Sequence, residues 1–312
     1  MSRKIEIVEV GPRDGLQNEA TVLSVDDRLE FIRMLEAAGS RRMEVVSFVN
    51  PKRVPQMAGA ESIMGALPHK SGRSHIGLVL NFKGWERLKA TRCDEANVVV
   101  CATESFGLRN QGAGVAQQIE TMHAIAADQA AQGGPPLSLT ISVAFGCPFE
   151  GEVELEQVVS IAREAAAAKI PEIALADTIG VADPWTVRAR LDAVRKVAHD
   201  AKLRLHFHDT RGTGLANAVA GLEAGADVLD ASCGGIGGCP FAPAATGNIA
   251  TEDLVYMMER AGFDTGLDLD ALIAAGKWIS AKLGRSPTSA LCRAGGFPSS
   301  RSEVAGRAGQ AA

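Results

Sequence analysis

Two histidines separated by a single residue, His206 and His208, directly follow a strand-like run at residues 203–205. Side chains of a strand alternate between its two faces, so both imidazoles project to the same side and could share one metal ion. An isolated pair of this kind could equally be a solvated or core-packed strand end. The spacing therefore makes a divalent-metal site the first hypothesis, which other residues of the chain have to support.

The elements that would position this pair form a repeating pattern. Short β-branched runs alternate with longer Ala- and Leu-rich runs, which is typical of βα units around a parallel sheet. We predict strands at residues 5–10, 42–46, 75–80, 95–101, 138–143, 172–175, 203–207 and 227–230. We predict helices at residues 25–38, 54–67, 82–90, 115–132, 154–169, 184–198, 212–224 and 251–261. Eight such units predict an α/β fold, a (β/α)8 TIM barrel, with one extra C-terminal helix at residues 269–283; a doubly wound open sheet is the alternative.

Length and composition limit the classes of function. The chain has 312 residues, 46% of them hydrophobic and 22% charged, with a formal net charge of −5, which gives no indication of a nucleic-acid partner. No apolar stretch approaches the roughly 20 residues that span a bilayer, and no secretory signal precedes the first strand. The six cysteines form no C-x-x-C pair, which favours free thiols in a reducing compartment. We expect a cytoplasmic enzyme without a membrane segment, with one domain at residues 1–300 and a flexible tail at 301–312.

Polar residues gather where the predicted strands end, which is where barrel enzymes place their active sites. These residues include Arg13, Asp14, Gln17, Glu44, Ser47, Asp177, His206, His208 and Asn248. Asp14 and the two histidines would supply one oxygen and two nitrogens to a cation. Asn248 is a plausible fourth ligand, although it could instead begin a helix. An open mixed shell of this kind suits Mg²⁺ or Mn²⁺ better than a structural zinc site.

A glycine-rich stretch follows the last predicted strand, with four glycines in residues 234–238 and Cys239 directly after them. Its backbone is free to move and to approach a ligand closely. A thiol on a mobile lid could exchange a proton with substrate. A phosphate-binding turn is the alternative for this stretch, and Cys239 could be a packing residue at its end.

Several longer motifs resemble one family. They are VEVGPRDGLQNE at residues 8–19, SFV at 47–49, PQM at 55–57, GCP at 146–148, DTIGV at 177–181, HFHDT at 206–210, GGCP at 237–240 and GNIATEDLVY at 247–256. In this order the chain resembles 3-hydroxy-3-methylglutaryl-CoA lyases from about residue 5 to residue 285. The resemblance implies a barrel lyase that cleaves a branched 3-hydroxyacyl-CoA by a retro-Claisen reaction, giving acetyl-CoA and, for the parent substrate, acetoacetate.

The resemblance also assigns roles to matching positions. The implied ligands of Mg²⁺ or Mn²⁺ are Asp14, His206, His208 and Asn248. Arg13 would stabilise the enolate oxygen of the departing thioester, and Cys239 would transfer a proton. The implied polar contacts to the acyl-CoA substrate or around it come from Gln17, Glu44, Ser47, Asn110 and Asp177. The base that removes the hydroxyl proton could be His206 or Asp177.

The chain departs from the family pattern at positions that could contact the acyl group. Arg211 and Thr213 stand where these lyases have Tyr and Gln, and Ser138 and Thr140 replace Arg and Tyr. We expect the same bond cleavage on an acyl group that could differ, such as another branched 3-hydroxyglutaryl-CoA or a citramalyl-like ester. Arg211 could contact that group or be an exposed helix-start residue.

Two other classes of function compete with this interpretation. A condensing acyltransferase of the isopropylmalate-synthase type also uses Arg-Asp and His-x-His motifs, but it usually lacks the Gly-Gly-Cys-Pro stretch and carries a further regulatory domain. A barrel that has lost catalysis would not be expected to keep the full polar set. The extra C-terminal helix could serve the interface of a homodimer.

Overall fold

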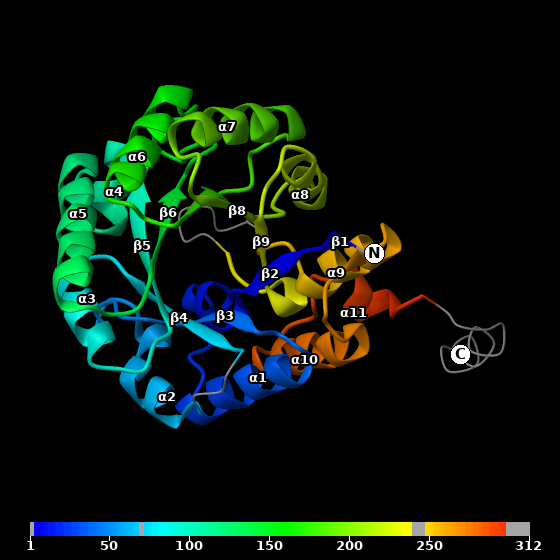
Figure 1. The fold of residues 1–312 in the computed structure, drawn as a ribbon. Helices are drawn as coiled ribbons and strands as arrows, with labels where there is room; N and C mark the ends of the chain where they lie inside the picture. Colours follow the sequence, from blue (N-terminus) through cyan, green and yellow to red (C-terminus); the bar gives the residue numbers. More distant parts are fainter. Residues whose placement is uncertain (1–2, 69–71, 239–246, 298–312) are drawn as a thin grey trace, which may run out of the picture.

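Eight parallel strands close into a barrel at the centre of the computed structural model, which describes residues 3–68, 72–238 and 247–297 (Figure 1). Each strand pairs with the next one in the sequence, and β9 pairs with β2 to complete the ring. The strands are β2 (Glu6–Glu9), β3 (Arg42–Ser47), β4 (Ser74–Val79), β5 (Glu95–Cys101), β6 (Leu137–Ser142), β7 (Glu172–Asp177), β8 (Lys202–Phe207) and β9 (Val228–Ala231). All eight predicted strands are present, and the predicted TIM barrel is confirmed.

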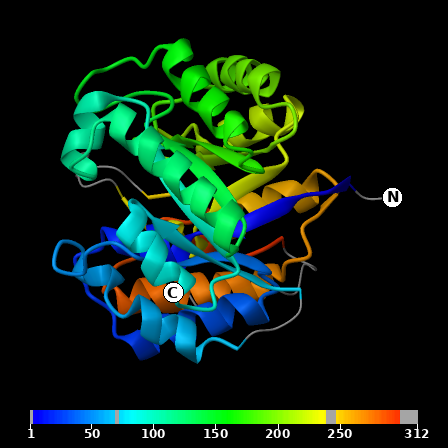
Figure 2. The same ribbon diagram turned by 60° about the vertical axis from the view of Figure 1, so that its left-hand side comes forward.

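Helices surround the barrel and cover its apolar outer surface (Figures 1 and 2). They are α1 (Val25–Ala37), α2 (Ala60–Ala66), α3 (Phe82–Lys89), α4 (Glu104–Asn110), α5 (Val115–Gln132), α6 (Leu155–Ala167), α7 (Pro184–Val197), α8 (Gly214–Glu223) and α9 (Thr251–Arg260). The helix starts follow capping chemistry, as at α7, where the Asp183 side chain accepts hydrogen bonds from the backbone N–H groups of Trp185 and Thr186. The short helix α4 was not predicted.

The predicted helix at residues 54–67 is wrong in its first half. A single 3-10 turn at Pro55–Met57 precedes α2, and Gly59 separates the two with a φ of 76°. Residues other than glycine rarely adopt this left-handed conformation, so the helix cannot run through it.

In the described part of the chain, two helices follow the last βα unit: the one that the sequence predicts and a further short one. The expected helix is α10 (Leu269–Lys282), which packs between α1 and α9 and so closes the outer ring between the first and last βα units. A second short helix, α11 (Ala290–Ala294), packs against α9 and α10. A two-stranded pair, β1 (Arg3–Lys4) with β10 (Phe263–Asp264), also joins the start of the described chain to the segment between α9 and α10. The predicted tail at 301–312 lies outside the described residues.

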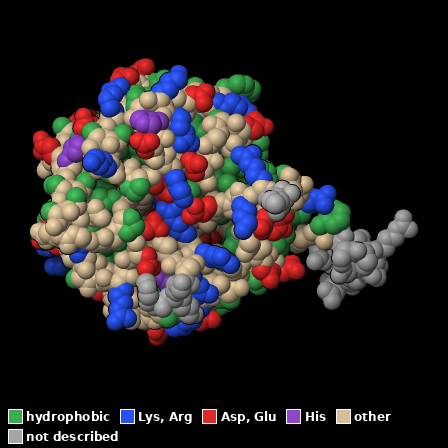
Figure 3. Space-filling model, viewed as in Figure 1, with side chains coloured by type: hydrophobic (Ala, Val, Ile, Leu, Met, Phe, Trp, Pro, Cys, Tyr) green, Lys and Arg blue, Asp and Glu red, His purple; other side chains and the backbone are tan. Residues whose placement is uncertain are grey.

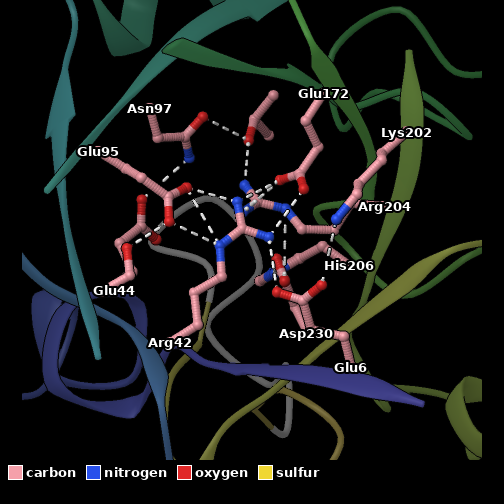
Figure 4. A network of polar contacts seen from close by, with 12 residues as sticks. Glu6, Arg42, Glu44, Glu95, Asn97, Glu172, Lys202, Arg204, His206 and Asp230 are labelled. Atoms are coloured by element: carbon pink, nitrogen blue, oxygen red, sulfur yellow. Dashed lines mark hydrogen bonds and ion pairs between the residues drawn. The ribbon is translucent and has the colours of Figure 1, made fainter. Parts of the chain in front are cut away.

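The inside of the barrel is polar at the end where the strands begin. Arg42 donates hydrogen bonds to Glu95 and Glu172 and to the more exposed Glu6, with N–O distances from 2.5 to 3.2 Å (Figure 4). The space-filling view shows acidic and basic side chains gathered at the centre of the face turned to the viewer (Figure 3). The hydrophobic core lies instead between the strands and the helices. None of the described helices is long and apolar enough to cross a membrane.

Candidate functional site

Asp14, His206 and His208 meet at the end of the barrel where the strands finish. Asp14 lies on a single π-helical turn after β2, Gly11–Gly15, and the histidines lie at the end of β8. The Oδ2 atom of Asp14 is 3.8 Å from Nε2 of His206 and 3.7 Å from Nε2 of His208. One ligand atom from each residue lies within 4.8 Å of the others. This separation leaves room for one cation between the three side chains.

The surroundings of these residues fit a divalent cation. The Asn248 side chain donates hydrogen bonds to Oδ2 of Asp14 at 2.9 Å and to the Ile236 carbonyl at 3.1 Å. The Asn248 side-chain oxygen is buried and has no hydrogen-bond partner among the described residues, and the same holds for Nδ1 of His208. An unpartnered amide oxygen, a carboxylate and two imidazoles form a mixed donor set that suits Mg²⁺ or Mn²⁺.

The carboxyl group of Asp14 is ionised in this setting. Burial alone would raise its pKa, but the charge of Arg13, the hydrogen bond from His208 and the charges of both histidines hold the pKa well below its usual range. An ionised carboxylate is the form that binds a cation.

His206 has a second partner that the sequence did not single out. Its Nδ1 atom lies 3.1 Å from Oδ2 of Asp230, a buried residue of β9. Burial lowers the pKa of His206, but the hydrogen bond to Asp230 and the charge of Asp14 outweigh it, so the pKa is raised. The Asp230 contact directs the other nitrogen of the ring toward Asp14.

Arg13 lies beside the metal ligands and is held on two sides. It donates from Nε to Oε2 of Glu44 at 2.8 Å and from Nη1 to Oδ1 of Asp14 at 2.6 Å. Glu44 accepts a further hydrogen bond from the side chain of Asn97 at 2.9 Å (Figure 4). The guanidinium of Arg13 is therefore a buried positive charge whose position is fixed.

These groups line one end of a cavity of about 460 Å³. Its polar lining residues include Asn97, Thr140, Ser142, Thr178 and Asp230. Its apolar lining residues include Val49, Val54, Leu78, Leu80, Val99 and Phe106. Arg53 also lines the cavity, and its guanidinium has no hydrogen-bond or ion-pair partner among the described residues.

Most of the residues predicted from the sequence lie at this cavity. Those that line it are Arg13, Asp14, Gln17, Asn110, His206 and His208. Glu44 and Asn248 contact lining residues without lining the cavity themselves. Cys239 lies outside the described residues, but the preceding Gly238 lines the cavity, and its carbonyl accepts a hydrogen bond from Asn18 at 2.6 Å.

Three predicted residues lie away from the cavity. Both oxygens of Asp177 accept backbone N–H groups, from Val181 and Ala182, at 2.9 Å each. This arrangement favours a role in holding the loop after β7 over proton transfer. Ser47 is fully buried, and its hydroxyl has no partner within the described part of the chain. Arg211 is exposed and donates to the carbonyls of residues 179 and 180 at 2.9 Å each.

Glu9, another residue that the sequence did not single out, joins the turn that carries Asp14 to the glycine-rich stretch. Its carboxylate accepts from the backbone N–H groups of Gly11 at 2.7 Å and Cys233 at 3.0 Å, and from the hydroxyl of Thr251 at 2.7 Å. Burial raises its pKa to about 7, although these hydrogen bonds lower it. The nearby Glu252 carboxyl adds a like charge that raises the pKa further.

The raised pKa of Glu9 predicts a loss of stability as the pH rises. A pKa that is higher in the folded chain than in the unfolded chain favours folding at low pH, and this contribution is lost between about pH 4.5 and 7. Replacing Glu9 with Gln keeps the shape and removes the charge. We expect the variant to lose less free energy of unfolding between pH 5 and 8 than the wild type, by on the order of 2–3 kcal/mol.

Urea unfolding at several pH values measures this difference. The exposed Glu30, which pairs only with Arg33, gives a matched control as Glu30→Gln. Parallel stability curves for Glu9→Gln and the wild type would show that Glu9 is not the titrating group.

Comparisons with known proteins agree with this geometry. The HMGL-like family model matches residues 4–279. The chain is 39% identical to a 3-hydroxy-3-isohexenylglutaryl-CoA/hydroxy-methylglutaryl-CoA lyase of Pseudomonas aeruginosa, covering 94% of this chain and 98% of that one. It is 41% identical to an (R)-citramalyl-CoA lyase of Chloroflexus aurantiacus, covering 93% and 95%.

A solved structure shares the fold over nearly the whole chain. It is an HMG-CoA lyase from Acenitobacter baumannii in complex with coenzyme A and 3-methylmalate, with a TM-score of 0.90 and 38% identity, covering 96% of this chain and 97% of that one. The match in sequence, fold and family model leads to one conclusion. The chain belongs to the HMGL-like family.

Proposed function

We propose that this protein is a divalent-metal-dependent lyase that cleaves 3-hydroxy-3-methylglutaryl-CoA, or a related branched 3-hydroxyacyl-CoA, by a retro-Claisen reaction. The products are acetyl-CoA and acetoacetate, or the corresponding keto acid. The observation that carries the proposal is the convergence of Asp14, His206 and His208 with the fixed guanidinium of Arg13 at one end of one cavity. The relatives with lyase activity on such thioesters support it.

The reaction places opposite demands on the two ends of the breaking bond. The hydroxyl at C3 loses its proton, the C2–C3 bond breaks, C3 becomes a ketone carbon, and the electron pair passes to the thioester as an enolate. Protonation of C2 then gives acetyl-CoA. A divalent cation held by Asp14, His206, His208 and Asn248 would supply Lewis acidity toward the hydroxyl.

Arg13 acts at the other end of the bond. Its guanidinium would face the thioester oxygen and stabilise the negative charge that develops there. Glu44 and Asp14 hold it in place before substrate binds, so little reorganisation is needed during the reaction. Of the two candidate bases, Asp177 has both oxygens hydrogen-bonded to backbone N–H groups. His206 lines the cavity, but its Nε2 could take the hydroxyl proton only while it is not bound to the cation. We retain Cys239 as the proposed proton donor to C2.

The cavity also suits an acyl-CoA substrate. The guanidinium of Arg53, which has no partner among the described residues, could pair with an anionic group of the substrate. The apolar lining residues could contact the acyl chain or the pantetheine arm. The small side chains of Thr140 and Ser142 leave space beside them for the acyl substituent. The names of the relatives give three acyl groups to compare: methylglutaryl, isohexenylglutaryl and citramalyl.

A panel of CoA thioesters tests the proposal. We expect acetyl-CoA release from at least one of these three thioesters in the presence of Mg²⁺ or Mn²⁺. Removing the metal with EDTA should abolish the release, and adding Mn²⁺ should restore it. Asp14→Ala serves as the inactive control. No release from any of the three, or condensation of acetyl-CoA with a 2-oxo acid as the main reaction, would contradict the proposal and favour the isopropylmalate-synthase type.

A further inference from the structure

The strand pairing places a carboxylate directly behind His206. Strands β8 and β9 pair with Arg204 opposite Val228 and Leu205 opposite Leu229, so the next inward-facing residues along these strands are His206 and Asp230. Asp230 is 4% exposed, and its Oδ2 atom lies 3.1 Å from Nδ1 of His206. The contact lies on the side of the ring away from Asp14, whose carboxylate faces Nε2.

Arg204 lies beneath this carboxylate and balances its charge. It precedes His206 by two residues on β8 and is 1% exposed (Figure 4). Its Nε atom is 3.5 Å from Oδ1 of Asp230, and its Nη1 atom is 3.1 Å from Oε1 of Glu172. It also donates to the hydroxyl of Thr140 at 3.4 Å. A carboxylate buried this deeply is costly without an opposite charge, so Arg204 is what permits Asp230 to stay beside His206.

The two histidines of the site differ in the hydrogen-bond partner of their Nδ1 atoms. Nδ1 of His206 is held by Asp230, whereas Nδ1 of His208 is buried with no hydrogen-bond partner among the described residues. Both rings turn Nε2 toward the same oxygen of Asp14. Of the pair, His206 is the ligand whose ring orientation is fixed before a cation arrives.

We propose that Asp230, held by Arg204, is a positioning residue for His206. Asp230 accepts the Nδ1–H hydrogen bond, which leaves Nε2 unprotonated and directed into the cation site. Carboxylates placed behind a metal-binding histidine in this way orient the ring and strengthen metal binding. The inference rests on the proposed function only in requiring a divalent cation, and it needs no particular substrate.

Two variants test the positioning role, with Mn²⁺ itself as the probe. Asp230→Asn keeps the size of the side chain and removes its charge, and Arg204→Met removes the charge that holds Asp230. We expect the dissociation constant for Mn²⁺, measured by EPR titration of the full chain, to rise by about 10- to 100-fold in Asp230→Asn. In Arg204→Met the dissociation constant for Mn²⁺ should also rise, by about 3-fold or more.

A matched control separates positioning from simple loss of stability. Glu95→Gln removes another carboxylate inside the barrel, a partly buried one that hydrogen-bonds Arg42 and Ser74 but, in the part of the chain that the structure describes, neither histidine. It should lower the unfolding midpoint and leave the Mn²⁺ dissociation constant within about 2-fold of wild type.

Nitrogen NMR of the metal-free protein gives a second readout. His206 should be protonated at Nδ1 in the wild type and in Glu95→Gln, and should show mixed tautomers in Asp230→Asn. A wild-type Mn²⁺ affinity in a folded Asp230→Asn or Arg204→Met variant would overturn the inference. A wild-type protein that binds Mn²⁺ but cleaves none of the thioesters would contradict the proposed function alone.

Discussion

Replacing Arg13 with Lys should lower kcat for acetyl-CoA release by about 100- to 1,000-fold, the range found when a fixed donor to a developing oxyanion is removed. The guanidinium of Arg13 donates to Glu44 and Asp14 at once and still lines the cavity. A lysine ammonium has no planar fork and cannot keep both contacts while facing the thioester. Steady-state kinetics at saturating Mn²⁺ measure the effect without interference from weaker metal binding.

The control for this prediction is a conservative change far from the cavity. Arg33 is exposed and pairs only with Glu30, so Arg33→Lys should leave kcat unchanged. A kcat for Arg13→Lys within tenfold of wild type would mean that Arg13 does not act at the thioester end of the bond.

Replacing Arg42 with Met is the change that we expect to destabilise the fold most. It removes the guanidinium that pairs with the partly buried Glu95 and with the buried Glu172, which keeps Arg204 as a partner. Removing one member of a buried ion pair typically costs about 3–5 kcal/mol. The guanidinium lowers the pKa of Glu95 although burial alone would raise it, so its loss should also raise that pKa. Chemical unfolding at pH 7 measures the free energy of unfolding.

An exposed lysine on the same face provides the comparison. Lys202 lies 3.6 Å from Glu6, and its side chain is 61% exposed, so Lys202→Met should change the free energy of unfolding by less than about 1 kcal/mol. A loss of less than 1 kcal/mol in Arg42→Met would show that the network inside the barrel contributes little to stability.

The barrel and the clustering of Asp14 with His206 and His208 could be predicted because both follow from periodicity. Alternation along β8 places His206 and His208 on one face, and the repeated βα pattern brings the ends of all eight strands to one rim. The same arrangement brings Asp14 and Asn248, which are 234 positions apart in the sequence, to the rim that carries the histidines. The order of the strands predicts this without any information on side-chain geometry.

The roles of Arg204 and Asp230 could not be predicted because both residues lie within strands whose neighbouring residues are apolar. Arg204 stands between two leucines, and Asp230 stands between Leu229 and Ala231. A charged residue within a buried strand is itself a signal, since it has to find a partner across the barrel. That signal indicates a partner of opposite charge or a hydrogen-bond partner, but not which one.

The positions of Asp177 and Arg211 depend on loops, where the sequence is least informative. The carboxylate of Asp177 is used by backbone N–H groups of the loop that follows it, and Arg211 donates to carbonyls of the same loop. A polar residue at a strand end can face the cavity or its own loop, and local backbone hydrogen bonds decide between the two.

The proposed metal ligands come from the first, seventh and eighth βα units of the barrel, and α10 packs across the seam between the first and the eighth. During synthesis on the ribosome, Asp14 is therefore translated about 190 or more residues before His206, His208 and Asn248, and the proposed cation site cannot form until they follow. A chain that stops at the end of β9 has Asp14 and both histidines without Asn248, and one that stops before α10 leaves the seam uncovered. High-affinity binding of Mn²⁺ would therefore require a chain that has been translated at least through Asn248.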